Sequence, residues 1–512
     1  MGAIYRDAIK VLVWLGRVRA SGIISSFATY GPGSRISSTS SLNEICTSMH
    51  DLDSYGQEGF EIHNDSSLDA FFQQAWFDRV WVVQEFVLAR ELEIYAGSCS
   101  FNYELFREAI RGVGTLVDMN LKATTVTLIQ DLIRIREQCQ VAVLGEGPLP
   151  TLYQCCYISR KCKCSIIHDK IYGVLGLAGN DLSIKVEYTY PATRLWLDLV
   201  LRSLEGGDLS PLHHAGISQG SGIDTHTTQS FIPPFEALED KPISLTGKPA
   251  FCAGHGTAAK VEVIALGLVK LRGIEIDTVT YVTSRVKEPG ISQTGHDIYQ
   301  IFSQPEELIR IAASSPYITE DFVQVFTRTL TAGAVGLAYK HEDKDSVFEW
   351  GTSFILYTSY RVIFLTRKGY IGLGPYGMQE GDKVVIFDGD STPFVLRADE
   401  SEYDRWKLVG ECYLDGWMYG DLFGHTVVEG EGEGEETNSQ DVQKYAEEEV
   451  GNEIGEAKSE ITLQTDNGED RGFFSFFKKL TASWRWGGET GSGAGEGKSE
   501  GKVLKRTSFI LC

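Results

Sequence analysis

The chain has 512 residues, of which 42% are hydrophobic and 11% aromatic, so it is long enough for two or three domains with sizeable cores. Its formal net charge of −23 argues against a nucleic-acid partner, because a nucleic-acid-binding surface needs a basic stripe that neutralises phosphates. Residues 429–470 carry −13 of that charge, with 15 acidic residues against Lys444 and Lys458, so the rest of the chain is only mildly acidic.

The N-terminal stretch and the cysteines predict a cytoplasmic protein. The apolar run in MGAIYRDAIKVLVWLGRV contains charged residues and precedes no small-residue cleavage site, so we expect no signal peptide. No apolar run reaches the roughly 18 residues that a membrane-spanning helix needs. Ten cysteines in a chain of this length, without a secretory signal, indicate reduced thiols in the cytosol.

The first hundred residues predict part of a parallel α/β sheet. A helix end leads into a continuously apolar strand, Val11–Leu15, of the kind that parallel sheets bury on both faces. Residues 19–66 are rich in Ser and Gly and predict a long loop. A helical period then runs through AWFDRVWVVQEFVLAR (75–90), which predicts a helix there.

Helices and strands alternate over the next 250 residues, so we predict a mixed helical and α+β region over 98–350. A strand is expected at 91–100, across the start of this region. Helices are expected at 102–117, 127–140, 169–178 and 192–207, and mixed β-prone and helical pieces from residue 251 onward. The helix at 192–207 has the clearest amphipathic pattern, with Leu195, Leu199 and Leu204 among its apolar positions.

From Tyr357 onward, short strands separated by Gly or Asp turns predict a small barrel or sandwich, a β-rich domain over 351–423. Within it, GLGPYG (372–377) has the glycine spacing of a dinucleotide-binding turn. Such a turn should open a helix, whereas this one contains a proline and precedes a strand. We therefore predict a loop between strands.

Residues 424–512 predict an acidic disordered tail, because they cannot bury enough apolar surface to offset the chain entropy. One segment at 471–486, from Phe473 to Trp486, combines aromatic and basic residues at helical spacing. Such a segment can lie on an anionic membrane surface or fill a groove of a partner. The alternative is a disordered stretch with some hydrophobic residues.

Metal-ligand residue types gather between residues 155 and 168. They are Cys155, Cys156, Cys162, Cys164 and His168. No C-x-x-C pair is present, and zinc sites usually show two such pairs. We therefore predict structural thiols, no metal site and no bound cofactor.

Four segments in chain order resemble the fungal heterokaryon incompatibility (HET) domain proteins. They are MGAIYRDAIKVLVWLG, WFDRVWVVQEFVLAR, DKIYGVLGLA, and GYIGLGPYGMQEGDKVVIFDGDSTPFVLR with the following KLVG and ECYLDGWMYGD. The resemblance spans about residues 1–423. It implies a protein of self/non-self recognition that triggers growth arrest and programmed cell death when genetically different hyphae fuse. Many members of the family act like innate immune receptors.

The chain departs from the family pattern at three places. The upstream strands with LSY-x-WG-like and D-x-x-C-I-N-Q motifs are absent, so we expect an N-terminally truncated HET domain, whose C-terminal part occupies residues 1–97. Ile166–Lys170 stands where the family has Asp-Pro-Arg-Asp-Lys, and FIPPFEALED replaces a tryptophan-rich segment. A parallel sheet without two of its strands would expose apolar edges.

The resemblance also implies a fold and a candidate site. HET domains are held to be distant relatives of TIR domains, so residues 1–97 are expected to form a partial TIR-like, flavodoxin-like parallel sheet with helices. Some TIR domains cleave NAD, and their catalytic helix carries a tryptophan followed four residues later by a glutamate. Trp81 and Glu85 have that spacing, and Asp78 joins them at i, i+3 and i+7. The implied activity is that of an NAD glycohydrolase, with NAD as its substrate.

Two interpretations of this helix remain open. In the catalytic one, Glu85 stabilises the oxocarbenium-like ribose that forms when nicotinamide leaves, and Trp81 stacks on the leaving ring. In the structural one, Trp81 belongs to the core, and Glu85 makes hydrogen bonds that fix the helix. The alternative function is a non-catalytic interaction module or degenerate paralogue whose tail docks on a membrane or partner. We expect self-association or protein partners in either case.

Overall fold

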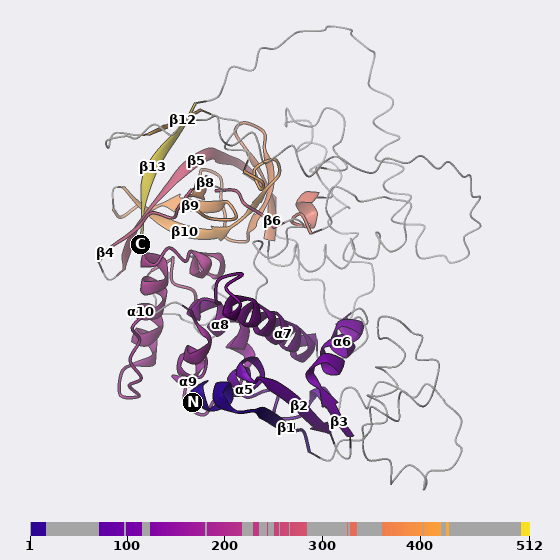
Figure 1. Ribbon diagram of the computed structural model, residues 1–512. Coiled ribbons are helices and arrows are strands. Elements are labelled where there is room, and N and C mark those ends of the chain that lie inside the picture. The colour runs from indigo at the N-terminus through magenta and orange to yellow at the C-terminus, as the bar shows by residue number, and fades with distance from the viewer. Residues whose placement is uncertain are drawn as a thin grey trace, which may run out of the picture. The chain divides into compact units, whose positions relative to one another are not determined.

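The structure is a computed structural model that describes residues 2–16, 71–96, 99–114, 123–179, 182–217, 229–234, 243, 250–254, 257–265, 267–283, 325, 328–334, 361–402, 404–420, 426–429 and 503–512. An α/β part and a β-rich part make up one compact unit (Figure 1). The second unit, Glu429–Val503, falls almost entirely outside the described residues, and so does the predicted amphipathic segment at 471–486.

A three-stranded sheet lies near the N-terminus. After helix α1 (Gly2–Asp7), strand β1 (Lys10–Trp14) pairs in parallel with β2 (Glu91–Ala96), as the sequence predicted. Strand β3 (Cys99–Asn102) then pairs antiparallel with β2, so the sheet is mixed rather than parallel throughout. The helices α5, α6 and α7 lie on one side of this sheet (Figure 1).

The prediction that β1 is buried on both faces is wrong. Side chains alternate between the two faces of a strand, and Val13 and Leu15 are buried in the core on one face. On the other face Leu12 is 62% exposed and Trp14 is 59% exposed. The sequence could not show that one face of β1 is exposed, because the residues on both faces of the strand are apolar.

The helices of the α/β part are mostly those that the sequence predicted. They are α5 (Val82–Leu88), α6 (Tyr103–Gly114), α7 (Ala123–Val143), α8 (Leu152–Ile158), α9 (Asp169–Tyr172) and α10 (Ala192–Glu205), with short 3-10 segments η2 (Ser159–Lys161), η3 (Leu175–Leu177) and η4 (Ser210–His214). The predicted helix at 169–178 is divided into α9 and η3. Thr151 caps α8, because its side chain accepts a hydrogen bond from the backbone N–H of Gln154.

A buried arginine fixes the end of α5. Arg136 of α7 is 2% exposed, and its Nη1 donates to the carbonyl oxygens of Phe86 at 2.7 Å and Val87 at 3.2 Å. Its Nη2 donates to the carbonyl of Arg90, and its guanidinium lies 4.5 Å from the centre of the Tyr103 ring. The last carbonyls of a helix have no partner within the helix, so Arg136 satisfies them and holds α5 against α7.

The β-rich part is a ten-stranded sheet with a closed ring inside it. Its strands are β4 (Val261–Ala265), β5 (Leu268–Val282), β6 (Arg361–Thr366), β7 (Ile371–Pro375), β8 (Lys383–Phe387), β9 (Phe394–Ala398), β10 (Arg405–Glu411), β11 (Tyr413–Leu414), β12 (Thr426–Glu429) and β13 (Val503–Leu511). The pairings run from β5 through β8, β9, β10 and β13 back to β5, which closes a barrel. Outside the ring, the same sheet continues from β5 through β6 and β7 to β11.

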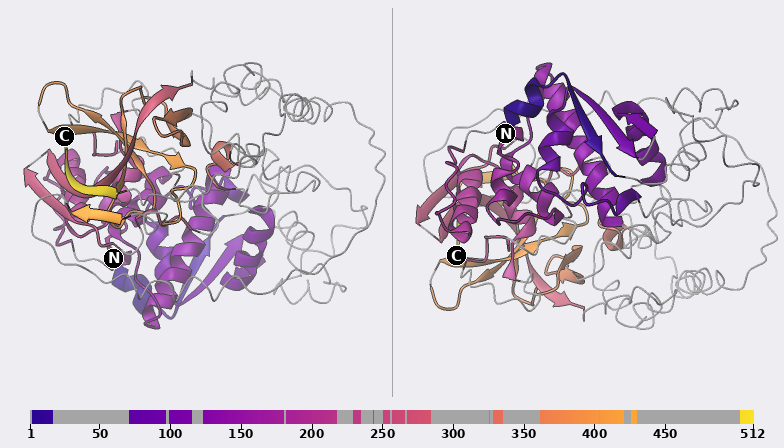
Figure 2. Two further views of the ribbon diagram at one scale, coloured as in Figure 1. Left: turned by 90° about the horizontal axis from the view of Figure 1, so that it is seen from above. Right: turned by 90° about the horizontal axis from the view of Figure 1, so that it is seen from below.

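The barrel corrects two predicted boundaries. Strands β4 and β5 precede residue 351, where we expected the β-rich domain to start. The expected disordered tail over 424–512 is wrong at its C-terminal end, since β13 lies beside β5 and β10 (yellow in Figure 2). Phe509 and Leu511 of β13 are buried. Composition averaged over the acidic tail hid this short apolar segment.

The prediction of a loop at GLGPYG is also wrong, because Ile371–Pro375 is strand β7. A methyl group on Gly372 would overlap the Phe364 ring, and one on Gly374 would overlap the Met378 sulfur. These glycines therefore allow close packing of large neighbours within a strand.

Candidate functional site

Glu85 lies in the first turn of α5, and two aromatic side chains hold its carboxylate. The Tyr5 hydroxyl of α1 donates to Oε1 at 3.2 Å, and Trp76 Nε1 donates to Oε2 at 3.0 Å. Burial and the charge of Glu85 raise the pKa of Tyr5, so the phenol keeps its proton and continues to donate. The Glu85 side chain is partly exposed, and each of its carboxylate oxygens accepts one of these hydrogen bonds.

The structure does not place Asp78 beside Glu85. Helix α5 begins at Val82, whereas residues 73–81 form turns and one isolated β-bridge between Arg79 and Lys163. Asp78 Oδ2 instead forms an ion pair with Lys163 Nζ at 2.7 Å. The predicted common helical face of Asp78, Trp81 and Glu85 is therefore wrong. The helical period could not reveal a bridge to a segment more than 80 residues away.

Trp81 directly precedes α5, and its partly buried side chain packs against the hydrophobic core. Trp76 and Tyr5, which hold Glu85, were not among the predicted site residues. Trp76 is nine residues before Glu85 and Tyr5 is 80 residues before it, so no helical spacing relates them. Only the packing of α1 and the turn against α5 brings them together.

The buried cysteines between residues 155 and 162 carry protonated thiols. Cys155, Cys156 and Cys162 are buried, and burial raises the pKa of all three thiols, that of Cys162 to about 12. A metal-binding thiol has to lose its proton. Within the described ranges, no group of three or more His, Cys, Asp or Glu side chains could hold a metal ion.

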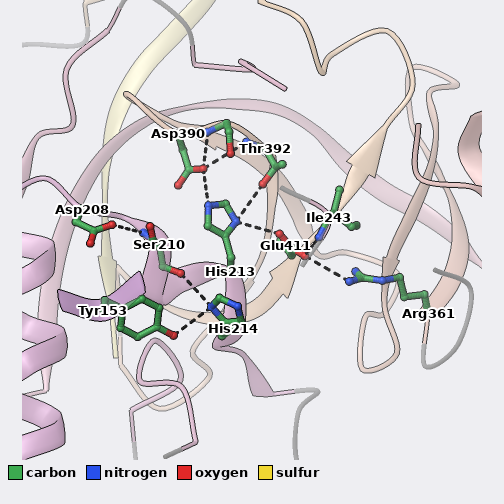
Figure 3. A network of polar contacts seen from close by, with 11 residues as sticks. Tyr153, Asp208, Ser210, His213, His214, Ile243, Arg361, Asp390, Thr392 and Glu411 are labelled. Carbon is green, nitrogen blue, oxygen red and sulfur yellow. Dashed lines mark hydrogen bonds and ion pairs between the residues drawn. The ribbon is translucent and has the colours of Figure 1, made fainter. Parts of the chain in front are cut away.

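A buried polar network that the sequence analysis missed joins η4 to the barrel (Figure 3). His213 Nε2 lies 3.1 Å from Asp390 Oδ1, and His213 Nδ1 lies 2.9 Å from Glu411 Oε2. These side chains are 9%, 1% and 4% exposed, respectively. Asp390 belongs to the turn between β8 and β9, and Glu411 is the last residue of β10.

His213 is an imidazolium in this network. Burial by itself lowers the pKa of a histidine, but the two carboxylates outweigh it and raise the pKa of His213 to about 10. Each ring nitrogen then donates to one carboxylate. The charged ring thus links η4 to the turn after β8, through Asp390, and to the end of β10, through Glu411.

The charges in the network balance. Glu411 Oε1 also accepts from Arg361 Nη2 at 3.3 Å and from the backbone N–H of Ile243. Burial by itself raises the pKa of Glu411. The positive charges of His213 and Arg361 lower it by more, so the net shift of this pKa is downward. Among the described residues, the carboxylates of Glu411 and Asp390 therefore face the cations of His213 and Arg361, and such pairing is the condition under which buried charges are tolerated.

The next residue, His214, is neutral, in contrast to the positively charged His213. Its Nδ1 lies 3.1 Å from the Tyr153 hydroxyl and 3.3 Å from the Ser210 carbonyl oxygen, and its ring centre lies 4.1 Å from that of Tyr157. Burial and the neighbouring charge of His213 lower the pKa of His214 to about 3. His214 is therefore neutral and packs as an aromatic ring.

The network around His213 is closed to solvent, so its groups cannot reach a substrate in this conformation. Its geometry instead makes it a joint that fixes the end of the α/β part on the barrel. His213 is separated from Glu411 by 198 residues, and no local sequence pattern links them. The His-His pair and the Asp-rich turn after β8 were the only visible signals.

Two family models match the chain. The model for the heterokaryon incompatibility protein (HET) family matches residues 1–85, and the Het-6 beta-barrel domain matches residues 339–429. Both matches support a fungal heterokaryon incompatibility protein, the family that the four sequence segments predicted.

A curated relative agrees with this assignment. The chain is 23% identical over 457 residues to heterokaryon incompatibility protein 6, OR allele, of Neurospora crassa, covering 71% of this chain and 67% of the relative. No solved structure matches the chain. None of the helices in the described part of the chain is long and apolar enough to cross a membrane.

Proposed function

We propose that this protein acts in self/non-self recognition between fungal hyphae and triggers growth arrest and programmed cell death after incompatible fusion. The observation that carries the proposal is the presence of a HET segment and a Het-6 barrel in one chain. Similarity to a heterokaryon incompatibility protein supports it. The His213 joint would offer a physical route between the two parts, because two ion pairs connect η4 to the barrel.

Induced expression in a filamentous fungus tests this proposal. At equal protein levels, the chain should stop growth and let a vital dye enter the cells. The His213→Asn variant, which lacks the positive charge of the joint, should cause weaker growth arrest and less dye entry. Normal growth at a protein level that is easily detected by immunoblot would contradict the proposal.

Within this function, NAD cleavage is the reaction that we propose for Glu85. The bond between ribose C1′ and the nicotinamide nitrogen breaks, its electron pair leaves with nicotinamide, and water attacks C1′ and gives up a proton. Glu85 would stabilise the positive ribose. Trp81 remains the proposed stacking residue, whereas Asp78 would contribute only after its ion pair with Lys163 opens. The support is a partly exposed carboxylate that two donors hold in one orientation.

Nicotinamide release from NAD by the purified chain tests this step. Glu85→Gln should abolish release, whereas Tyr5→Phe, which removes one hydrogen bond and keeps the carboxylate, should retain most of it. If release is absent from the folded chain, or equal in Glu85→Gln, then Glu85 only ties α1 and the preceding turn to α5.

A non-catalytic interaction module is the second candidate function. One observation favours it: both oxygens of Glu85 already accept hydrogen bonds from the chain's own side chains. Growth arrest that persists in Glu85→Gln would support this candidate over NAD cleavage. Its expected membrane or partner contact through Phe473–Trp486 lies outside the described residues.

A further inference from the structure

Strand β13 joins the barrel from a distant part of the chain. Leu504–Cys512 belongs to the same compact unit as Met1–Val428, although residues 430–502 separate β13 from β12. The strand lies between β5 and β10, and its pairing with both closes the ring (Figure 2). We call the place between β5 and β10 that this strand fills the β13 slot.

The backbone of β13 is held in the way that a sheet edge binds an added strand. Residues 506–511 pair antiparallel with β5 in an unbroken register, in which Arg506 faces Ile274 and Leu511 faces Val269. On the other side, Ile510 and Leu511 pair in parallel with β10. Main-chain pairing of this kind gives an added strand its affinity, even when the strand comes from another chain.

Alternate side chains of β13 make the slot selective. Phe509 and Leu511 are 2% and 0% exposed and belong to the core that the barrel shares with the α/β part. The centre of the Phe509 ring lies 6.2 Å from that of Phe387 and 5.9 Å from that of Trp406. Where a strand is added to a sheet, pockets for every second side chain select the sequence that fits.

Polar contacts at both ends of the paired stretch fix its register. At one end, Arg506 Nε donates to Oδ1 of Asp388 at 3.1 Å, and the Asp388 side chain is 3% exposed. At the other end, the Ser230 backbone N–H donates to the Cys512 carbonyl oxygen at 2.9 Å, and the Ser230 hydroxyl donates to the same oxygen. A shift by one residue would break both contacts and turn Phe509 out of the core.

We propose that the β13 slot is a peptide-binding site and that β13 is its resident ligand. The ligand class is an extended peptide with an arginine at the position of Arg506 and large apolar side chains at those of Phe509 and Leu511. The partners named above all lie before residue 430, so a separate peptide of this sequence can make the same contacts. The proposal does not depend on NAD cleavage or on the cell-death role.

Binding of a free peptide to full-length chains tests the proposal. A fluorescent peptide of residues 503–512, VLKRTSFILC, is titrated with the parent chain and with the F509D chain, and its anisotropy is measured. A carboxylate cannot enter the apolar core, so F509D should empty the slot and let the peptide bind. The parent should bind at least about tenfold more weakly, because tethering gives its own strand an effective concentration that micromolar peptide cannot match.

Altered peptides check the individual contacts. The F509D peptide should bind the F509D chain at least about tenfold more weakly than VLKRTSFILC, because it cannot fill the same pocket. The R506E peptide should also bind more weakly, because it places a second carboxylate beside buried Asp388. The matched control is the S508A peptide, which should bind as tightly as VLKRTSFILC, since Ser508 is exposed.

A second variant covers the case in which the F509D chain does not fold alone. The R506E chain keeps Phe509 and weakens only the hold of β13 on Asp388, so it should bind the peptide more tightly than the parent does. Equal binding to the parent and to the variant would place the peptide outside the slot and overturn the proposal. A folded variant chain that binds no peptide would overturn it as well, because the slot would then hold β13 only as part of the continuous chain.

Discussion

The charge on His213 makes stability depend on pH. Because the pKa of His213 is raised from 6.5 to about 10 in the folded chain, its contribution is fully present below pH 6.5 and is lost as pH rises through about 10. At about 1.4 kcal/mol per pKa unit, the full contribution is on the order of 5 kcal/mol. Between pH 6.5 and 8.5 we expect a loss of about 2 kcal/mol.

The neighbouring groups do not obscure this loss. The pKa of His214 is lowered to about 3, so its contribution is present above pH 6.5 and is lost as pH falls below that value. Glu411 has a lowered pKa, so its contribution is present above the usual 4.5 and is also lost only in acid. The network therefore predicts a stability maximum near pH 6.5, with His213 setting the alkaline side.

Urea unfolding at pH 6.5 and 8.5 measures the effect in the parent chain and in His213→Asn. The parent should lose about 2 kcal/mol more than the variant between these two pH values. Where the variant does not fold, Glu411→Gln takes its place, and removal of one carboxylate should reduce the loss. An equal pH dependence in the parent and the variants would refute the reasoning.

Three further predictions concern residues that shape the fold around the two sites. Arg136→Met should lower the free energy of unfolding by about 2–3 kcal/mol, because the last carbonyls of α5 lose their donors, and Arg136→Lys should cost less. Gly372→Ala should cost about 1–3 kcal/mol through overlap with Phe364, whereas Gly147→Ala, which has room for a methyl group, should be nearly neutral. Trp76→Phe should cost about 1 kcal/mol, because Glu85 loses a donor. Urea unfolding checks all three.

The sequence predicted elements whose stability is local. Helix α10 was predicted within about two residues because its apolar positions recur at helical spacing and two glycines end it. The strands β6, β8, β9 and β10 were predicted from short apolar runs between Gly or Asp turns. Each of these signals lies within the element itself, so a single sequence contains it.

Features that depend on distant partners could not be predicted in the same way. Strand β13 was missed because its burial depends on β5, more than 200 residues earlier. The start of α5 was misplaced because the segment around residue 163 holds the preceding turn. His213 was missed because its charge exists only where Asp390 and Glu411 meet. Glu85 was singled out through a family resemblance, while its partners Tyr5 and Trp76 came only from the structure.

The viability of fused hyphal compartments tests the central claim most directly, namely that this chain acts in heterokaryon incompatibility. Forced fusions should be made between tester strains and a host that carries or lacks the gene, and dead compartments should be counted with a vital dye. We predict death in fusions with some testers, none in self-fusions, and survival in all pairings once the gene is removed. Equal survival with and without the gene in every pairing would contradict the claim.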